Sequence, residues 1–117
     1  MAHYKDIKIF QSMYILTLEA HKISSKFGRN YKYDLGSRIR EKCYEALDLI
    51  VKINSLPDMV KIEKLSELDI RKEEIIILLR LGFDLKEISA GQSEILNKKL
   101  QEIGLQIGGW QKWLKRN

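Results

Sequence analysis

The sequence has few of the residues that interrupt helices, cross-link chains or bind metals. Its 117 residues include one proline, Pro57, and no dense cluster of turn residues, so long helices are expected rather than many short strands. A single cysteine, Cys43, excludes an intrachain disulfide framework and a cysteine metal cluster. Neither His3 nor His21 follows a glutamate in the Glu-x-x-His spacing, which argues against the di-iron sites of helical bundles. We therefore expect no metal.

Long apolar segments are also missing. The chain has no uncharged apolar run of the roughly 18 residues that a membrane-spanning helix needs. The first ten residues, MAHYKDIKIF, lack the apolar core of a signal peptide. These two absences, together with the lone cysteine, predict a cytoplasmic protein with no membrane partner.

Catalytic motifs are absent as well. The phosphate-binding pattern G-x-x-x-x-G-K-[ST] does not occur, and no serine or cysteine has a histidine in a recognisable motif. Cys43 falls on an apolar helix stripe, where a cysteine usually serves as a small core residue. We expect neither an enzyme nor a bound cofactor.

The residues that are present fit one folded domain over residues 1–117. Apolar residues make up 44% and charged residues 32% of the chain, which is typical of a globular protein with a modest core. Apolar residues recur at spacings of three and four in four stretches, which is the signature of amphipathic helices.

Capping and stop signals divide these stretches into four helices. The first ends near Ser25 and is followed by a turn at 27–30, and the second begins after Asp34, a residue whose carboxylate can accept an unpaired backbone N–H. Pro57 ends the second helix, because proline disfavours the helical conformation in the residue before it. The third helix is expected from about residue 61 to about residue 85.

The fourth helix begins after Ser89 and continues to Trp113 or beyond. The apolar run IIILLRL at 75–81 is compatible with a buried strand, but the surrounding pattern is long and rich in Glu, Lys and Leu, which favours a helix. Four helices of this length with short connections predict an all-α, antiparallel up-down four-helix bundle.

The spacing also predicts which side chains form the core. The first two helices contribute Ile9, Met13, Leu16, Ala20, Ile23, Phe27, Leu35, Ile39, Cys43, Ala46, Ile50 and Ile53. The last two contribute Ile62, Leu65, Ile75, Ile76, Leu79, Phe83, Leu96, Leu100, Ile103, Ile107, Trp110 and Leu114.

Basic residues concentrate in two segments. The net charge is +5, yet residues 58–97 hold nine acidic and six basic residues, so the cationic surplus lies before and after this middle region. Cations near aromatic rings are the ingredients of single-stranded nucleic-acid binding, and Tyr31, Tyr33 and Tyr44 lie among the first basic group. An ordinary solvated helix face with tyrosines at its rim explains the pattern equally well. The candidate phosphate-binding residues are Lys22, Lys26, Arg29, Arg38, Arg40 and Lys42.

Three glycines interrupt the fourth helix. Gly104, Gly108 and Gly109 each cost about 1 kcal/mol of helix stability relative to alanine, so a close contact is expected to offset them. That contact lies either between helices of one domain or between subunits, and spacing alone favours the former. Exposed apolar residues such as Leu105 and Trp113 favour a homo-oligomer. The candidate interface residues are Arg80, Gly104, Gly108, Gly109 and Trp110.

Several segments together resemble a known family. They are SKF at 25–27, LGSRI at 35–39, RLGFDL at 80–85 and EIGLQIGGW at 102–110, of which the last is the most specific. In this order they are similar to the Avd family, the accessory variability determinants of diversity-generating retroelements. The wider group of four-helix bundles includes proteins encoded by ribosomal RNA intervening sequences. This chain has Gly28 and Gly82 where Avd-like chains usually have proline and alanine.

The resemblance implies a homopentameric barrel of four-helix bundles with basic surfaces. It also implies binding to the element's reverse transcriptase and to RNA or DNA during mutagenic copying. The alternative is an interaction scaffold of the intervening-sequence type that has no retroelement partner.

Overall fold

The computed structural model describes residues 7–116, which form four long helices and one short helix. They are α1 (Lys8–Ser25), α2 (Arg29–Lys32), α3 (Leu35–Asn54), α4 (Asp58–Asp84) and α5 (Ala90–Arg116). No strand occurs within the described residues, so the run at 75–81 is helical, as predicted.

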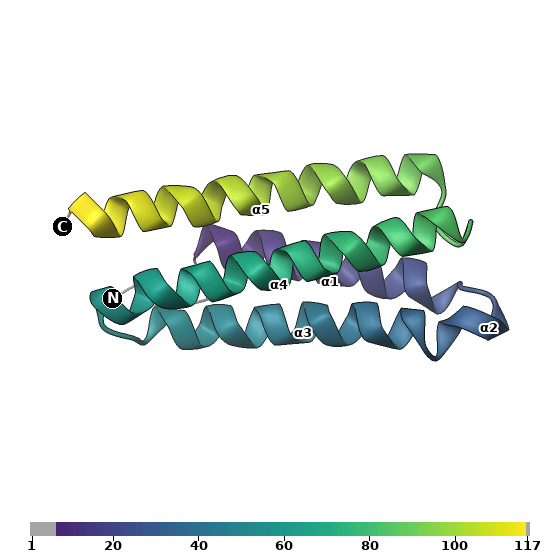
Figure 1. The fold of residues 1–117 in the computed structure, drawn as a ribbon, viewed down its shortest axis with the longest axis horizontal. Helices are drawn as coiled ribbons and strands as arrows, with labels where there is room; N and C mark the ends of the chain where they lie inside the picture. The colour runs from purple at the N-terminus through teal and green to yellow at the C-terminus, as the bar shows by residue number, and fades with distance from the viewer. Residues whose placement is uncertain (1–6, 117) are drawn as a thin grey trace.

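The long helices form an up-down bundle (Figure 1). α1 packs against α3 and α5, and α4 packs against the same two helices, so α1 and α4 lie on one diagonal. The bundle measures 48 × 21 × 21 Å. α2 and the α4–α5 loop lie at one end, which we call the α2 end, and the C-terminus of α5 lies at the other (Figure 1). This confirms the predicted four-helix bundle.

The two predicted capping residues, Asp34 and Ser89, precede α3 and α5 as expected, whereas α4 begins at Asp58, three residues before the expected start. The Asp34 carboxylate accepts the backbone N–H of Leu35, and α4 begins directly after Pro57. At the start of α5 the Gln92 N–H donates to Ser89 Oγ at 3.1 Å, and the Ser89 N–H donates to Gln92 Oε1 at 2.9 Å. This reciprocal pair is a capping box, which satisfies two backbone donors that the helix itself leaves unpaired.

The predicted turn at 27–30 is partly wrong, because Arg29–Lys32 forms a short helix there. Tyr31 and Lys32 donate their backbone N–H groups to the carbonyl of Gly28, both at 3.0 Å. The Glu87 carboxylate, from the α4–α5 loop, accepts the backbone N–H of Gly28. A contact between residues 59 positions apart therefore fixes the entry to α2.

The core follows the predicted stripes with one clear exception. Phe83 was expected inside but is 36% exposed. The inner position of the last turn of α4 belongs instead to Gly82, which Ile88 from the loop covers. Four other predicted core residues are only partly buried and pack against the core: Ile23, Ile62, Ile76 and Trp110. Leu49, Leu68 and Ile88 are buried core residues that the prediction omitted.

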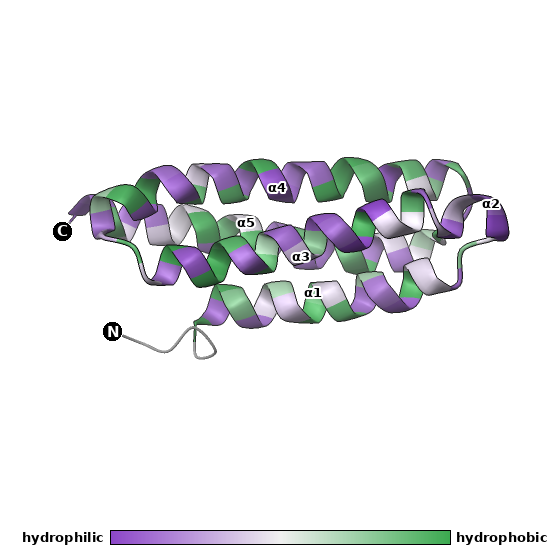
Figure 2. Cartoon of the chain, turned by 90° about the horizontal axis from the view of Figure 1, so that it is seen from below, coloured by the Kyte–Doolittle hydropathy of each residue, from purple (hydrophilic) through white to green (hydrophobic). Residues whose placement is uncertain are grey.

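α4 carries a second apolar stripe on its outer side. Ile70, Ile77 and Leu81 are spaced by seven and four residues, so they share a helix face, and all three are exposed. Ile75 and Leu79, from the same apolar run, point into the core. Apolar residues thus lie on both sides of α4. Figure 2 shows hydrophobic and hydrophilic residues alternating along this helix.

Glycines in the helices differ sharply in their surroundings. A Cβ placed on Gly82 would lie 2.7 Å from Cδ1 of Ile88 and 3.6 Å from Cζ of Phe27, whereas a Cβ on Gly108 would meet no atom within 4 Å. Gly82 therefore makes the close contact inside the bundle. Of the two alternatives for the glycines of the fourth helix, the contact within one domain does not occur at Gly108, which faces open space, as does Gly109.

We predict opposite effects of leucine at these two glycines. Gly82→Leu should lower the free energy of unfolding by about 1–3 kcal/mol, because a larger side chain must displace the buried Ile88. Gly108→Leu should leave it unchanged or raise it by up to about 1 kcal/mol through higher helix propensity. Urea unfolding followed by circular dichroism measures both. Equal stabilities for the two variants would contradict this packing.

Candidate nucleic-acid interface

The six predicted phosphate-binding residues surround the α2 end but do not share one side of the bundle. Lys22 of α1 and Lys26, the residue that follows α1, line a hollow of about 200 Å³ whose other wall includes Gln92 and Ile95 of α5. Lys42 lies between α3 and α4, on the opposite side. The structure therefore places the predicted residues around the bundle rather than on a single face.

Lys42 belongs to an ion-pair network. Its Nζ lies 3.4 Å from Glu74 and 3.5 Å from Glu45. Arg71 also contacts Glu74, at 2.7 Å. The hydrogen bond from Arg71 lowers the pKa of Glu74, and the charge of Lys42 acts in the same direction. Two carboxylates already balance this lysine, so it is a weak candidate for a phosphate contact.

Arg40 braces three elements at the α2 end. Its guanidinium donates to Ser24 Oγ of α1 at 2.8 Å, to Ser37 Oγ of α3 at 3.2 Å and to the carbonyl of Lys32 in α2 at 3.3 Å. These three hydrogen bonds use the N–H donors of a planar, rigid guanidinium group. Arg40 therefore links α1, α2 and α3 at the α2 end.

Four of the predicted cations are exposed: Lys22, Lys26, Arg29 and Arg38. Within residues 7–116 none of them forms an ion pair with a carboxylate. Their positive charges therefore remain available to an external anion.

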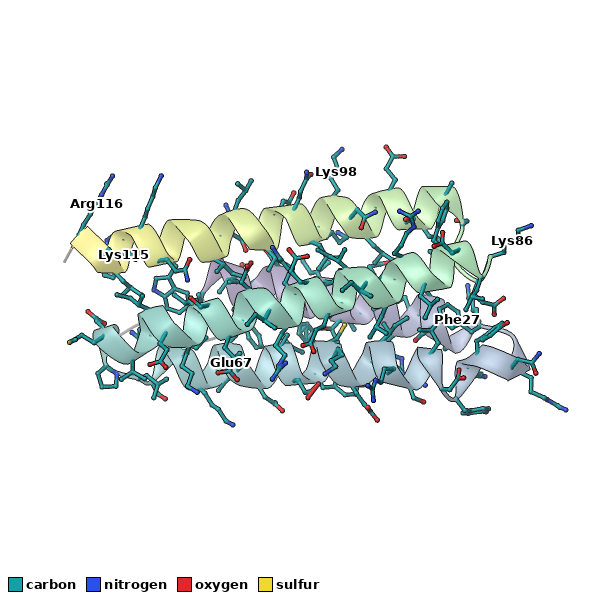
Figure 3. The ribbon with its side chains drawn as sticks, in the orientation of Figure 1. Phe27, Glu67, Lys86, Lys98, Lys115 and Arg116 are labelled. Atoms are coloured by element: carbon teal, nitrogen blue, oxygen red, sulfur yellow. The ribbon has the colours of Figure 1, made fainter. Side chains whose placement is uncertain are left out.

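Lys86 joins this group and was missed by the sequence analysis. It lies in the α4–α5 loop with a φ of 65°, is exposed, and points away from the bundle at the α2 end (Figure 3). The antiparallel topology brings it to the same end as α2, although it is more than 50 residues away in sequence. The signal available was a lysine between the third and fourth predicted helices, because an antiparallel bundle brings that connection to the same end as the turn after the first helix. We call Lys22, Lys26, Arg29, Arg38 and Lys86 the end cations.

The three tyrosines take different roles. Tyr31 is partly buried against the core, and Tyr44 contacts His21 with ring centroids 6.4 Å apart. Tyr33 is 75% exposed, and the Lys32 ammonium lies 5.7 Å from its ring centroid. Of the three, Tyr33 is the most exposed, so its ring is the best placed for base stacking.

The predicted interface residues are also located by the structure. Arg80 is exposed, and its Nε lies 3.1 Å from a carboxylate oxygen of Asp84. The Lys72 ammonium lies 3.0 Å from the position of a Cβ on Gly104. Trp110 packs against the core, and the ammonium of Lys61 lies 5.9 Å from its ring centroid.

Metal-binding clusters, membrane-spanning helices and the single cysteine were also considered in the sequence, and the described residues show the following. They hold no group of three His, Cys, Asp or Glu residues able to bind a metal ion. None of their helices is long and apolar enough to cross a bilayer. Cys43 is fully buried, and this burial raises the pKa of its thiol to about 12, although a hydrogen bond with Thr17 acts in the opposite direction. The thiolate needed for nucleophilic chemistry is therefore disfavoured at neutral pH.

The chain is similar to a known protein family. A family model described as bAvd-like matches residues 8–114. No curated protein matched the sequence.

We predict that Cys43 is unreactive in the folded chain. At pH 8 a thiol reagent such as Ellman's reagent should react only as fast as the chain unfolds, because the folded state disfavours the thiolate. The pKa of the Cys43 thiol is higher in the folded chain than its unfolded value of roughly 8.5. The protonated thiol therefore contributes to the free energy of unfolding below that pH, and this contribution is lost as the pH rises towards 12. The denatured chain in guanidinium is the control. Immediate labelling of the native chain would contradict the buried placement.

Proposed function

The chain belongs to the bAvd-like family, and from this membership we propose that it is a non-enzymatic accessory protein of a diversity-generating retroelement. In this proposal it binds RNA or DNA together with the element's reverse transcriptase and supports mutagenic copying. The observation that carries the nucleic-acid part is the set of end cations, which are exposed and form no ion pair with a carboxylate of the described chain.

Three carboxylates at the α2 end already have partners within the chain. Glu87 accepts the N–H of Gly28, Asp34 accepts the N–H of Leu35, and Asp84 pairs with Arg80. Their oxygens are thus engaged in holding the loops, while the end cations extend into solvent. This arrangement favours a polyanion, whose phosphates attract lysine and arginine and release counterions on binding.

Tyr33 adds a contact of a second kind. Its ring is exposed beside Lys32, between the cations Arg29 and Arg38 in sequence. An aromatic ring stacks on any base, so it strengthens binding to unpaired nucleotides without reading their sequence. The proposed binding is therefore electrostatic, tolerant of sequence and better for single strands than for a uniform duplex.

The proposal includes self-association, as a homopentamer of bundles in keeping with the family resemblance. Its support is the number of large apolar side chains that the bundle leaves exposed, among them Tyr14, Leu18, Ile70, Ile77 and Leu105. Extended apolar surface is uncommon on monomers and marks interaction sites. Repeating the end cations around an assembly would strengthen a weak single-site interaction by avidity.

We predict that binding to RNA and DNA weakens steeply with salt and depends on the α2 end. Charge reversal in an Arg29→Glu/Arg38→Glu variant should lower affinity at least tenfold and reduce the slope of log affinity against log salt by about 2, one for each lost phosphate contact. Filter binding on structured RNA and on random-sequence DNA at several salt concentrations measures both quantities. Circular dichroism should show unchanged helicity, since both side chains are exposed.

The matched control reverses two exposed lysines at the other end of the bundle, Lys112→Glu/Lys115→Glu. Each double variant changes the net charge by −4, from +5 to +1. A nonspecific charge effect would therefore lower the nucleic-acid affinity of the two variants equally. Equal losses, or a flat salt dependence of the unmodified chain, would reject the α2-end site. An intervening-sequence scaffold that binds only proteins would then be the better account.

A further inference from the structure

The ion pairs of the bundle are distributed unevenly around it. Every ion pair within residues 7–116 joins residues of α3 or α4, and none involves a lysine or arginine of α1 or α5. α1, the following Lys26 and α5 together hold eight cations and three carboxylates, a formal charge of +5. α3 and α4 hold nine cations and ten carboxylates, a formal charge of −1. The adjacent helices α1 and α5 therefore form a cationic side of the bundle.

The cationic side meets the α2 end at the hollow that Lys22 and Lys26 line. We call this hollow, of about 200 Å³, the α1–α5 hollow. Its lining also includes two apolar side chains, Ile23 and Ile95, and one carboxylate, Glu19. Ile95 is 56% exposed, so its apolar surface is open to a ligand. Glu19 forms no ion pair with a cation of the described chain.

Lys99 extends the set of lysines away from the α2 end. It follows Ile95 by four residues and precedes Gln106 by seven. Gln106 faces α1, because its amide nitrogen donates a hydrogen bond to Ser12 Oγ at 3.0 Å. Residues at these spacings share one side of a helix, so Lys99 lies on the side of α5 that faces α1. It is about 6 Å further along α5 than Ile95.

The lysines and isoleucines of this side have the chemistry that binds an unpaired nucleic-acid strand. Lysines along a row attract the successive phosphates of a backbone. The side chains of Ile23 and Ile95 offer apolar contact to bases, which a single strand exposes and a duplex keeps stacked inside. A strand that follows Lys26, Lys22 and Lys99 therefore meets both kinds of contact in one hollow.

The opposite side of the bundle has a hollow of the same volume but the reverse balance of charge. This α3–α4 hollow, of about 200 Å³, is lined by three carboxylates, Glu45, Asp48 and Glu67, and by two cations, Lys52 and Arg71. Arg71 already pairs with Glu67 at 3.9 Å. A surplus of carboxylates repels phosphates, so a strand that leaves the α2 end is directed to the α1–α5 side.

We propose that a single nucleic-acid strand leaves the α2 end through the α1–α5 hollow, with its phosphates on Lys26, Lys22 and Lys99. This path rests on the proposed binding of nucleic acid at the α2 end and deepens it. It assigns Lys99 as a further phosphate contact. It also gives Glu19 an opposing role, because a carboxylate beside the path repels the phosphates and limits affinity.

The first experiment removes this repulsion. Glu19→Gln should raise the affinity for single-stranded oligothymidylate about two- to fivefold at low salt, the range of an exposed charge pair. Filter binding measures the affinity. Because the expected change is a gain, a loss of folding cannot imitate it.

Asp48→Asn is the matched control, because it makes the same change of net charge, from +5 to +6, in the α3–α4 hollow. The two residues lie at similar distances from the α2 end. His21 and Tyr44 are level, since their rings are in contact, and Glu19 lies two residues and Asp48 four residues further from that end. The control should leave the affinity unchanged.

The second experiment removes the proposed contact at Lys99. Lys99→Gln should lower the affinity about two- to fivefold and reduce the slope of log affinity against log salt by about one. Lys52→Gln, in the α3–α4 hollow, makes the same change of net charge, from +5 to +4, and should alter neither quantity. Circular dichroism should show equal helicity for all four variants.

The outcomes separate the path from the binding on which it rests. If the unmodified chain binds the strand but each variant matches its control, the path is wrong while binding at the α2 end stands. If the unmodified chain binds no nucleic acid, both the path and the proposed binding fail. A duplex of the same length should show smaller effects of Glu19→Gln and Lys99→Gln, and equal or larger effects on the duplex would overturn the assignment of a single strand.

Discussion

The structure depends on the limited width of its core. A bundle 21 Å across has room for one inward stripe of side chains from each long helix, at spacings of three and four. Met13, Ile39, Leu65 and Ile103 are examples from the four helices, and each is fully buried. Apolar residues beyond these stripes must lie outside. The exposed apolar faces are therefore a consequence of a sequence that supplies more apolar side chains than one bundle can enclose.

The antiparallel connections impose the second constraint, because they bring distant segments to a common end. Gly82, Ile88 and Phe27 pack together where the α4–α5 loop meets the end of α1, and Glu87 holds the start of α2. Arg40 adds bonds to α1 and α2. The groups that bind one another at this end are mainly backbone N–H groups, carboxylates and one arginine. The cations left over extend into solvent, which separates a cationic end from the apolar sides.

Much of this architecture was predictable from the sequence. The helix boundaries followed from local signals, such as Asp34, Pro57 and Ser89, whose effects do not depend on distant residues. Features that depend on tertiary contacts were not predictable. The short helix α2 relies on Glu87, and Phe83 lies at the rim because Ile88 from the following loop occupies the space over Gly82. The dependence on tertiary contacts also explains why the functional residues were predicted only in part. Sequence composition could gather Lys22 to Lys42 as a basic segment, but it could not separate the braced Arg40 from the exposed Arg38 or bring Lys86 to the same end.

The central claim is that nucleic acid binds around the α2 end, and lysine footprinting tests it most directly. Acetylation of the folded protein with and without bound RNA, followed by mass spectrometry, reports the accessibility of each lysine. The account predicts that RNA protects Lys22, Lys26 and Lys86 while Lys112 and Lys115, at the other end of the bundle, react as before. Protection of Lys112 and Lys115 with no change at Lys22, Lys26 and Lys86 would contradict it.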